Sequence, residues 1–264
     1  MDPFVFWALA ATLGTWLITA LGAATVLFFS APKEKHMDLM LGFAAGVMIA
    51  ASFWSLLQPA IERAEAAGKP SWLVATTGFL SGALFLWASD KIVSMARRSA
   101  AVPAHPGKRA ERALMLVLSV TLHNIPEGLA VGVAFGALQG GFTTEALTGA
   151  VSVAVGIGLQ NFPEGAAVAL PLRRDGLSRK RSFFFGQASG MVEPLAGVLG
   201  ALAVTHIEAI LPFALSFAAG AMILVAVHEL IPECQQNRSA SPYFATTGIL
   251  LGFAAMMLLD VMLG

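Results

Sequence analysis

The sequence carries little charge and almost no cysteine. Only 12% of its 264 residues are Asp, Glu, Lys or Arg, and the formal net charge is zero. A soluble domain carries roughly 25% charged residues, so the composition argues against a soluble protein. The single cysteine, Cys234, excludes an intrachain disulfide and a thiolate metal cluster. Because there is no basic surplus, nothing indicates nucleic-acid binding.

Long hydrophobic runs take the place of charge. Hydrophobic residues make up 57% of the chain, and the mean hydropathy is +0.75. A helix needs about 20 apolar residues to cross a bilayer. The first residues hold Asp2 and no Lys or Arg, so we expect the first run to be a permanent span and not a cleaved signal peptide. We predict an all-α membrane protein with one transmembrane domain, residues 1–264, and eight membrane-spanning helices over residues 4–30, 37–60, 71–93, 112–138, 143–172, 183–205, 210–233 and 242–263.

Basic residues lie almost entirely on one side of these spans. The loops after the first, third, fifth and seventh spans hold fourteen of the sixteen Lys and Arg residues, and the opposite side has only Arg63 and Lys69. The positive-inside rule makes the first side cytoplasmic. We therefore predict a multi-pass protein of the cytoplasmic (inner) membrane with both termini outside. The longest connection, about 97–111, is expected to be a flexible cytoplasmic loop.

Two segments of the chain return in the same order. Residues 43–49 resemble 217–223, residues 76–82 resemble 246–252, and Asp90 has a counterpart in Asp260. Each copy runs in the opposite direction across the membrane. We predict an inverted repeat of three spans on each side of a central pair, a 3+2+3 plan that transporters often use with the substrate site at the midplane. The alternative is a chance similarity between helices rich in alanine and glycine.

A polar motif interrupts the fourth span and returns in the fifth. The first copy reads LHNIPEG over 122–128, and the second reads QNFPEG over 160–165. In each copy the Glu lies four residues after a His or Gln and three after an Asn, so these side chains share one helix face. Two antiparallel helices would bring both faces together at one depth. A carboxylate buried in lipid costs several kcal/mol unless a cation or hydrogen bonds compensate it.

A third carboxylate, Glu193, lies near the middle of the sixth span, and Met48 lies at the same depth in the second. Met48 has packing as its alternative role. Imidazole together with carboxylate favours Zn²⁺, Fe²⁺, Mn²⁺ or Cd²⁺ over Ca²⁺ or Mg²⁺. The candidate metal ligands at the midplane are Met48, His123, Asn124, Glu127, Gln160, Asn161, Glu164 and Glu193.

A second polar group lies closer to the cytoplasmic side. His228 and Glu229 end the seventh span, and Asp38 and Asp90 stand at span ends on the same side. These four residues are candidates for a metal exit route. Capping of helix ends or pairing with nearby Lys residues is the alternative, above all for Asp38 and Asp90.

With these residues in view, the chain resembles the ZIP (Zrt- and Irt-like) family of divalent metal transporters, above all its bacterial members. The likeness covers essentially the whole chain and rests on the His-Asn-x-Pro-Glu-Gly motif and its second copy. It implies the ZIP fold, a homodimer and an elevator-like motion. It also implies one metal site at Met48, His123, Glu127, Gln160 and Glu164, and an adjacent one at Asn124, Glu127, Asn161, Glu164 and Glu193. This chain departs from the family at two positions: Gln160 stands where many relatives have His, and Asn161 stands where some have Asp, so the adjacent site has one acid fewer than in those relatives.

We therefore expect an importer of Zn²⁺, with Cd²⁺, Fe²⁺ and Mn²⁺ as further substrates, and no enzymatic activity. An intramembrane metal-dependent hydrolase is the main rival, since Glu193 would serve as its base. A metal-selective channel is another. A proton-coupled carrier of an organic solute is a third, although no intramembrane Lys or Arg is present to hold an anion.

Overall fold

The computed structural model describes residues 2–28, 34–99, 108–174, 176–206, 208–235 and 243–263, although some side chains within these ranges, including that of His123, lie outside the description. Every regular element in these ranges is a helix. In chain order the elements are α1 (Pro3–Phe28), α2 (Glu34–Ala51), η1 (Ser52–Leu57), α3 (Gln58–Ala66), α4 (Ser71–Ser99), α5 (Lys108–Gly136), η2 (Ala137–Gly140), α6 (Thr144–Arg174), α7 (Arg179–Ser189), α8 (Val192–His206), η3 (Glu208–Ile210), α9 (Leu211–Val225), η4 (Ala226–Leu230), α10 (Ile231–Cys234) and α11 (Tyr243–Leu263).

The helices are long and apolar enough to cross a membrane. Among the described residues seven stretches meet this criterion by length and composition, at Pro3–Phe28, Lys35–Ala66, Ser71–Ile92, Thr144–Arg173, Arg179–Val204, Leu211–Cys234 and Tyr243–Met262. The predicted all-α membrane class is confirmed. The fourth predicted span corresponds to α5, a 29-residue helix that is not one of the seven. The count of eight spans therefore stays a prediction.

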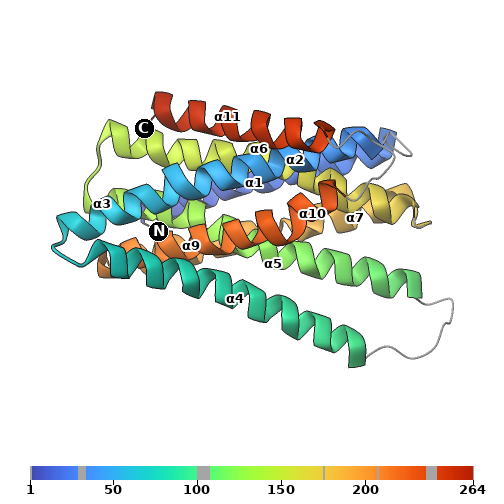
Figure 1. Cartoon of the computed structure of the whole chain (residues 1–264), viewed down its shortest axis with the longest axis horizontal. Coiled ribbons are helices and arrows are strands. Elements are labelled where there is room, and N and C mark those ends of the chain that lie inside the picture. The colour runs from blue at the N-terminus through green and yellow to red at the C-terminus, as the bar shows by residue number, and fades with distance from the viewer. Residues whose placement is uncertain are drawn as a thin grey trace.

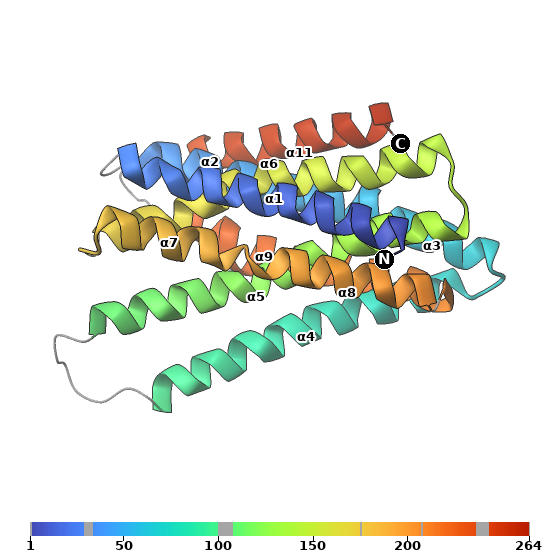
Figure 2. The ribbon, with the colours of Figure 1, turned by 180° about the vertical axis from the view of Figure 1, so that it is seen from behind.

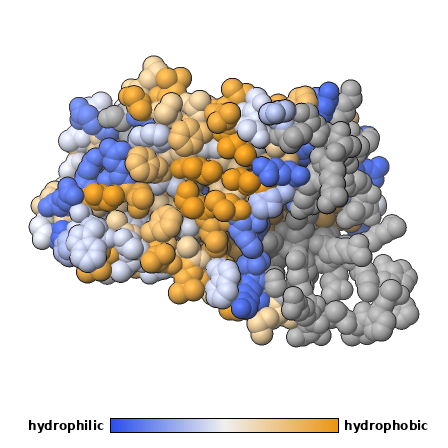
Figure 3. Space-filling model, in the orientation of Figure 1, coloured by the Kyte–Doolittle hydropathy of each residue, from blue (hydrophilic) through white to orange (hydrophobic). Residues whose placement is uncertain are grey.

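The outer surface of the bundle matches a lipid environment. Large apolar side chains point outward along most of its length, for example Leu21 at 62% exposure and Leu195 at 68%. Apolar residues cover the middle of the face in Figure 3, and hydrophilic residues lie toward its left end and along the border of the grey region. Since water would penalise such a surface, lipid is the solvent that it fits.

Both termini lie at the same end of the bundle (Figures 1 and 2). We call this the terminal end. The opposite end, called the basic end, holds Lys35, Lys91, Arg173 and the first turn of α7, with Arg179, Lys180 and Arg181. The described part of the chain thus has its positive charge concentrated at the end away from the termini, as the predicted topology requires.

The repeated segments pack against each other in a crossed pattern. Residues 43–49 on α2 pack against 246–252 on α11, and residues 217–223 on α9 pack against 76–82 on α4. The two central helices follow a matching pattern. Helix α6 packs against α1 of the first repeat, and α5 packs against α8 of the second. This crossed pairing agrees with the inverted repeat that the sequence predicts.

Three spans are less regular than the sequence suggests. The second span contains the wide π-helical turn η1, and the seventh contains η4 at the equivalent place in the repeat. Each wide turn is followed by a proline, Pro59 or Pro232, whose missing N–H cannot continue the α-helical pattern. The sixth span is two helices, α7 and α8, separated at Gly190 and Met191.

The connection between α4 and α5 is shorter than predicted. Helix α4 extends to Ser99 and α5 begins at Lys108, so both margins of the predicted 97–111 loop are helical. Charged side chains at helix ends outside the bilayer favour such extensions, because the helix there needs no apolar face. Residues 100–107 lie outside the described residues.

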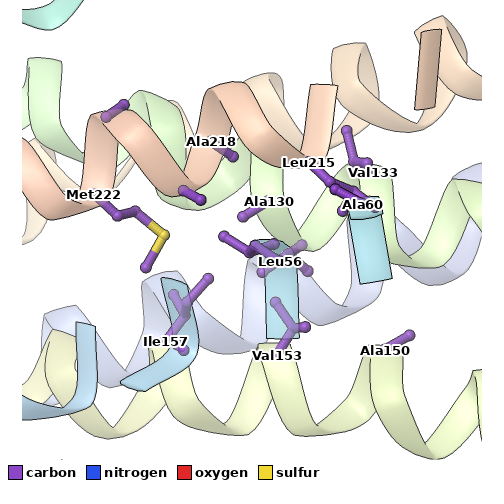
Figure 4. Packing of buried hydrophobic residues seen from close by; sticks show 14 of the residues in the cluster. Leu56, Ala60, Ala130, Val133, Ala150, Val153, Ile157, Leu215, Ala218 and Met222 are labelled. Atoms are coloured by element: carbon purple, nitrogen blue, oxygen red, sulfur yellow. The ribbon is translucent and has the colours of Figure 1, made fainter. Parts of the chain in front are cut away.

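One large apolar cluster fills the terminal half of the bundle. It includes Val5 and Ala8 near the start of α1, and it continues to Met48, Ile157 and Met222 near the middle. In Figure 4, Leu56 and Ala60 lie between the side chains of α9 and those of α6. Among the described side chains, the basic half holds smaller clusters around Ala23, Val117 and Leu41.

Candidate metal site

The two motifs meet in the middle of the bundle. The amide Nε2 of Gln160 on α6 donates a hydrogen bond to Oε1 of Glu127 on α5, at 2.6 Å. Both side chains are buried, with no more than 1% of their surface exposed. The shared helix faces predicted from the four-residue spacing therefore adjoin at one depth. The side chain of His123, one turn before Glu127, lies outside the described residues.

Three carboxyl groups gather at this level. Glu127 interacts electrostatically with Glu164 and Glu193, and Glu164 also interacts with Glu193 and with Glu229. Glu127 and Glu193 are fully buried, whereas Glu164 is partly exposed. Because like charges repel and burial removes their hydration, this arrangement needs compensating positive charge or donors.

Glu193 obtains its donors from two other helices. Its Oε2 accepts a hydrogen bond from Oγ1 of Thr15 at 2.5 Å, and its Oε1 accepts one from Oγ1 of Thr19 at 3.4 Å. The amide Nδ2 of Asn161 lies 2.9 Å from both carboxylate oxygens. Our sequence reasoning missed Thr15 and Thr19. The signal was present, because threonines at 12, 15 and 19 form a polar stripe on an apolar span.

The break in the sixth span provides a second polar contact. The carbonyl of Ser189, at the end of α7, accepts a hydrogen bond from Nδ2 of Asn124 at 2.9 Å. Helix α8 then begins at Val192, with Glu193 in its first turn. The N-terminus of a helix stabilises a carboxylate there. The helix break thus fixes both Asn124 and Glu193.

Four oxygen atoms at the centre have no hydrogen-bond partner although they are buried: Oδ1 of Asn124, Oε2 of Glu127, Oε1 of Gln160 and Oδ1 of Asn161. Unpartnered buried oxygens are costly in a low-dielectric interior, and a cation is a chemically suitable partner. Among the described side chains no three His, Cys, Asp or Glu residues form a metal-binding group. The unpartnered amide oxygens are therefore candidate ligands beside the carboxylates.

Met48 belongs to the apolar cluster. Its side chain is 1% exposed, and Met222, its counterpart in the repeat, belongs to the same cluster. The structure thus records Met48 in packing contacts.

The four exit-route candidates are not equivalent. On η4, His228 is exposed and Glu229 is partly exposed and interacts with Glu164. Asp38 is buried near the start of α2 and interacts electrostatically with Cys234 of α10. Asp90 is partly exposed on α4, which packs against α9 and α5 and runs along one edge of the bundle (Figure 1). No described contact joins Asp90 to the other three.

Comparison with known proteins identifies the family. The sequence model of the family described as ZIP Zinc transporter matches residues 99–260, which include both motifs and Glu193. The chain belongs to the ZIP family. It is 39% identical to Zinc transporter ZIP11 of Homo sapiens, with 98% of each chain covered. It is also 40% identical to Zinc transporter GufA of Myxococcus xanthus, with 97% of this chain and 98% of GufA covered.

The alignment with a third relative leaves part of that relative uncovered. Zinc transporter ZIPB of Bordetella bronchiseptica is 36% identical, and the alignment covers 93% of this chain and 78% of ZIPB. Membership confirms the resemblance inferred from the motifs. Because these relatives are named zinc transporters, divalent metal transport is supported for this member of the ZIP family, with zinc as the suggested substrate.

Proposed function

We propose that this protein imports Zn²⁺ across the cytoplasmic membrane, with Cd²⁺, Fe²⁺ and Mn²⁺ as further substrates. The observation that carries the proposal is the environment of Glu127. Its carboxyl group is fully buried between apolar helices, has one oxygen without a partner, and interacts electrostatically with two more carboxyl groups. A divalent cation compensates this charge, and the amide oxygens nearby complete an oxygen-rich shell.

The proposed ligands of the ion are His123, Glu127, Gln160 and Glu164, with Met48 closing the shell from the apolar side. Asn124, Asn161 and Glu193 complete the polar site around them. An imidazole nitrogen and a thioether sulfur favour borderline-soft ions such as Zn²⁺ and Cd²⁺. This mixed set gives no all-oxygen cage of the kind that Ca²⁺ or Mg²⁺ requires.

The exposure of polar side chains toward the basic end supports a proposal for the direction of transport. The terminal half contains the large apolar cluster, whereas on the basic side Glu164 and Glu229 are partly exposed and His228 is exposed. We propose that the basic end faces the cytoplasm and that the ion leaves past Glu229 and His228. Asp38 and Asp90 would act later on this route.

The tight helix pairs suggest which parts move. The first set of helices contains the pairs α1–α6 and α5–α8. The second set contains the pairs α2–α11 and α4–α9. The site residues belong almost entirely to the first set. We propose an elevator motion in which the first set carries the ion past the second, and a homodimer in which the second set provides the fixed part.

Zinc uptake into proteoliposomes tests the proposal. We expect Glu127→Gln and Glu164→Gln to abolish saturable uptake, because each removes one charged ligand. Glu145→Gln is the matched control, since Glu145 is an exposed glutamate at the start of α6. Full uptake by either site variant would refute the importer. Flux that rises without saturation would favour the channel, and hydrolysis of peptide or ester substrates without uptake would favour the enzyme.

Reporter fusions test the orientation. Alkaline phosphatase fused after residue 264 is expected to be active, because the enzyme folds only outside the cytoplasm. The same reporter inserted at 103 is expected to be inactive, since the loops at the basic end hold most of the Lys and Arg residues. The opposite pattern would reverse the proposed direction of transport.

A further inference from the structure

The carboxyl group of Glu193 differs from the other two in its hydrogen bonds. Both of its oxygens are occupied by donors from Thr15, Thr19 and Asn161. Neither is among the buried atoms that lack a partner. Glu127, in contrast, has only Oε1 occupied, by Gln160, and its Oε2 is free. Of these two buried carboxyl groups, Glu127 has lone pairs available for an ion and Glu193 has its own set of donors.

Asn161 accounts for much of this difference between Glu193 and Glu127. Its Nδ2 donates to both oxygens of Glu193 and to the backbone carbonyl of Thr15, at 3.2 Å. Its Oδ1 is buried and has no partner. The nitrogen side of this amide is therefore directed to Glu193, and the oxygen is left for another group.

Because the amide of Asn161 directs its nitrogen to Glu193, we infer that Asn161 replaces a second cation. We also infer that Glu193 is a positioning residue for Asn161. The inference rests on the proposed function and deepens it: the central site holds one divalent ion per chain. A second cation bound to Glu193 would have to displace the Asn161 amide and two threonine hydroxyls. The donors already supply the positive partial charge that the buried carboxylate needs.

The location of Glu193 strengthens this role. It stands in the first turn of α8, where the helix N-terminus stabilises a negative charge. Thr15 and Thr19 belong to α1, and Asn161 belongs to α6. One carboxylate therefore joins three helices and orients the amide oxygen of Asn161. This buried hydrogen bond is lost if either partner changes from donor to acceptor or from acceptor to donor.

Counting zinc per polypeptide tests the inference. The purified full chain in lipid nanodiscs is equilibrated with free Zn²⁺ and analysed by elemental mass spectrometry, with folding checked by size exclusion. We expect one ion for the unmodified protein. Asn161→Asp places two carboxylates together without a donor, so we expect a second ion. Asn161→Asp combined with Glu193→Gln restores an amide–carboxylate pair of opposite polarity, and the count should return to one.

Gln58→Glu provides the matched control. Gln58 donates to Glu62 at 2.9 Å, so this pair has the same chemistry, but it is exposed. The count for this variant should stay at one. Two ions in the unmodified protein would overturn the inference while leaving the importer intact, and this count decides the matter even if the variants fail to fold. A single ion in folded Asn161→Asp, or a gain in Gln58→Glu, would also overturn it. No bound zinc at all would remove the proposed function as well.

Discussion

Gly46 on α2 and Gly220 on α9 make equivalent contacts in the two halves of the protein. A Cβ atom on Gly46 would collide with the backbone carbonyl of Ile249, and one on Gly220 would collide with that of Phe79. Ile249 and Phe79 are themselves counterparts in the repeat. The inverted repeat is therefore present in the close helix contacts and not only in the sequence.

Adding a side chain at either glycine should separate a helix pair. We expect Gly46→Val and Gly220→Val each to lower the free energy of unfolding by about 1–3 kcal/mol or more, because the colliding atom is backbone and cannot rotate away. In a chain of this size that corresponds to a fall of about 5 °C in the apparent Tm. Thermal unfolding in detergent, followed by size exclusion, measures it.

Gly149→Ala is the control for this pair. Apart from its chain neighbours and the backbone of its own helical turn, no atom lies within 4 Å of a Cβ placed at Gly149, which lies on α6. Since alanine is favoured over glycine inside a helix by roughly 0.5–1 kcal/mol, this variant should be as stable as the unmodified protein or slightly more so. Equal loss of stability at Gly149 and at Gly46 would contradict the repeat contacts.

The sequence carries enough information for the main plan of the protein. Glu127 and Gln160 could be placed together because helical spacing fixes their faces and alternating spans fix their direction. Thr15 and Thr19 could not be recognised in the same way. Each hydroxyl also bonds to a carbonyl of its own helix, which is the ordinary behaviour of threonine in an apolar span. Only packing shows that they also reach Glu193.

The wide turns were not predictable in detail either. Pro59 and Pro232 mark irregular backbone, but a proline is compatible with a kink, a break or a π-helical turn. Which of these forms depends on how the neighbouring helices satisfy the backbone. At the break before α8, a Cβ atom on Gly190 would lie 3.1 Å from side-chain atoms of Glu193 and Thr19, so these side chains would have to shift slightly to admit it.

Gln160→His should change metal preference. An imidazole nitrogen suits Zn²⁺ better than an amide oxygen does, while Mn²⁺ gains less from the exchange. We expect the Kd for Zn²⁺ to fall by about tenfold, a magnitude typical of single changes in a metal site, and the Kd for Mn²⁺ to change by less. Competitive titration of the purified protein measures both constants. Gln58→His at the exposed position should leave them unchanged, and a parallel gain for both metals at position 160 would argue against direct ligation.

Glu229→Gln should slow release without weakening binding. Glu229 is partly exposed and interacts with Glu164, so it lies on the path that we propose for the ion toward the basic end. We expect the saturated uptake rate to fall by about threefold or more, a change of roughly 0.7 kcal/mol in the barrier. The equilibrium Kd for Zn²⁺ should stay within about twofold, since Glu229 is not a proposed ligand. An unchanged rate would exclude Glu229 from the route.

Leu56→Ala should lower the free energy of unfolding, because Leu56 belongs to the apolar cluster that fills the terminal half. Leu56 is fully buried in the apolar cluster, between side chains of α6 and α9 (Figure 4). In water-soluble proteins a buried Leu→Ala change costs about 2–5 kcal/mol through lost transfer energy and a residual cavity. In a bilayer the transfer contribution is small because lipid is as apolar as leucine, so the lost packing contacts dominate and we expect the lower end, about 2 kcal/mol. Leu199→Ala, at 63% exposure on α8, loses few such contacts and should leave the apparent Tm unchanged. If Leu56→Ala were as stable as Leu199→Ala, the cluster would be loosely packed and would not explain why the site is closed toward the terminal end.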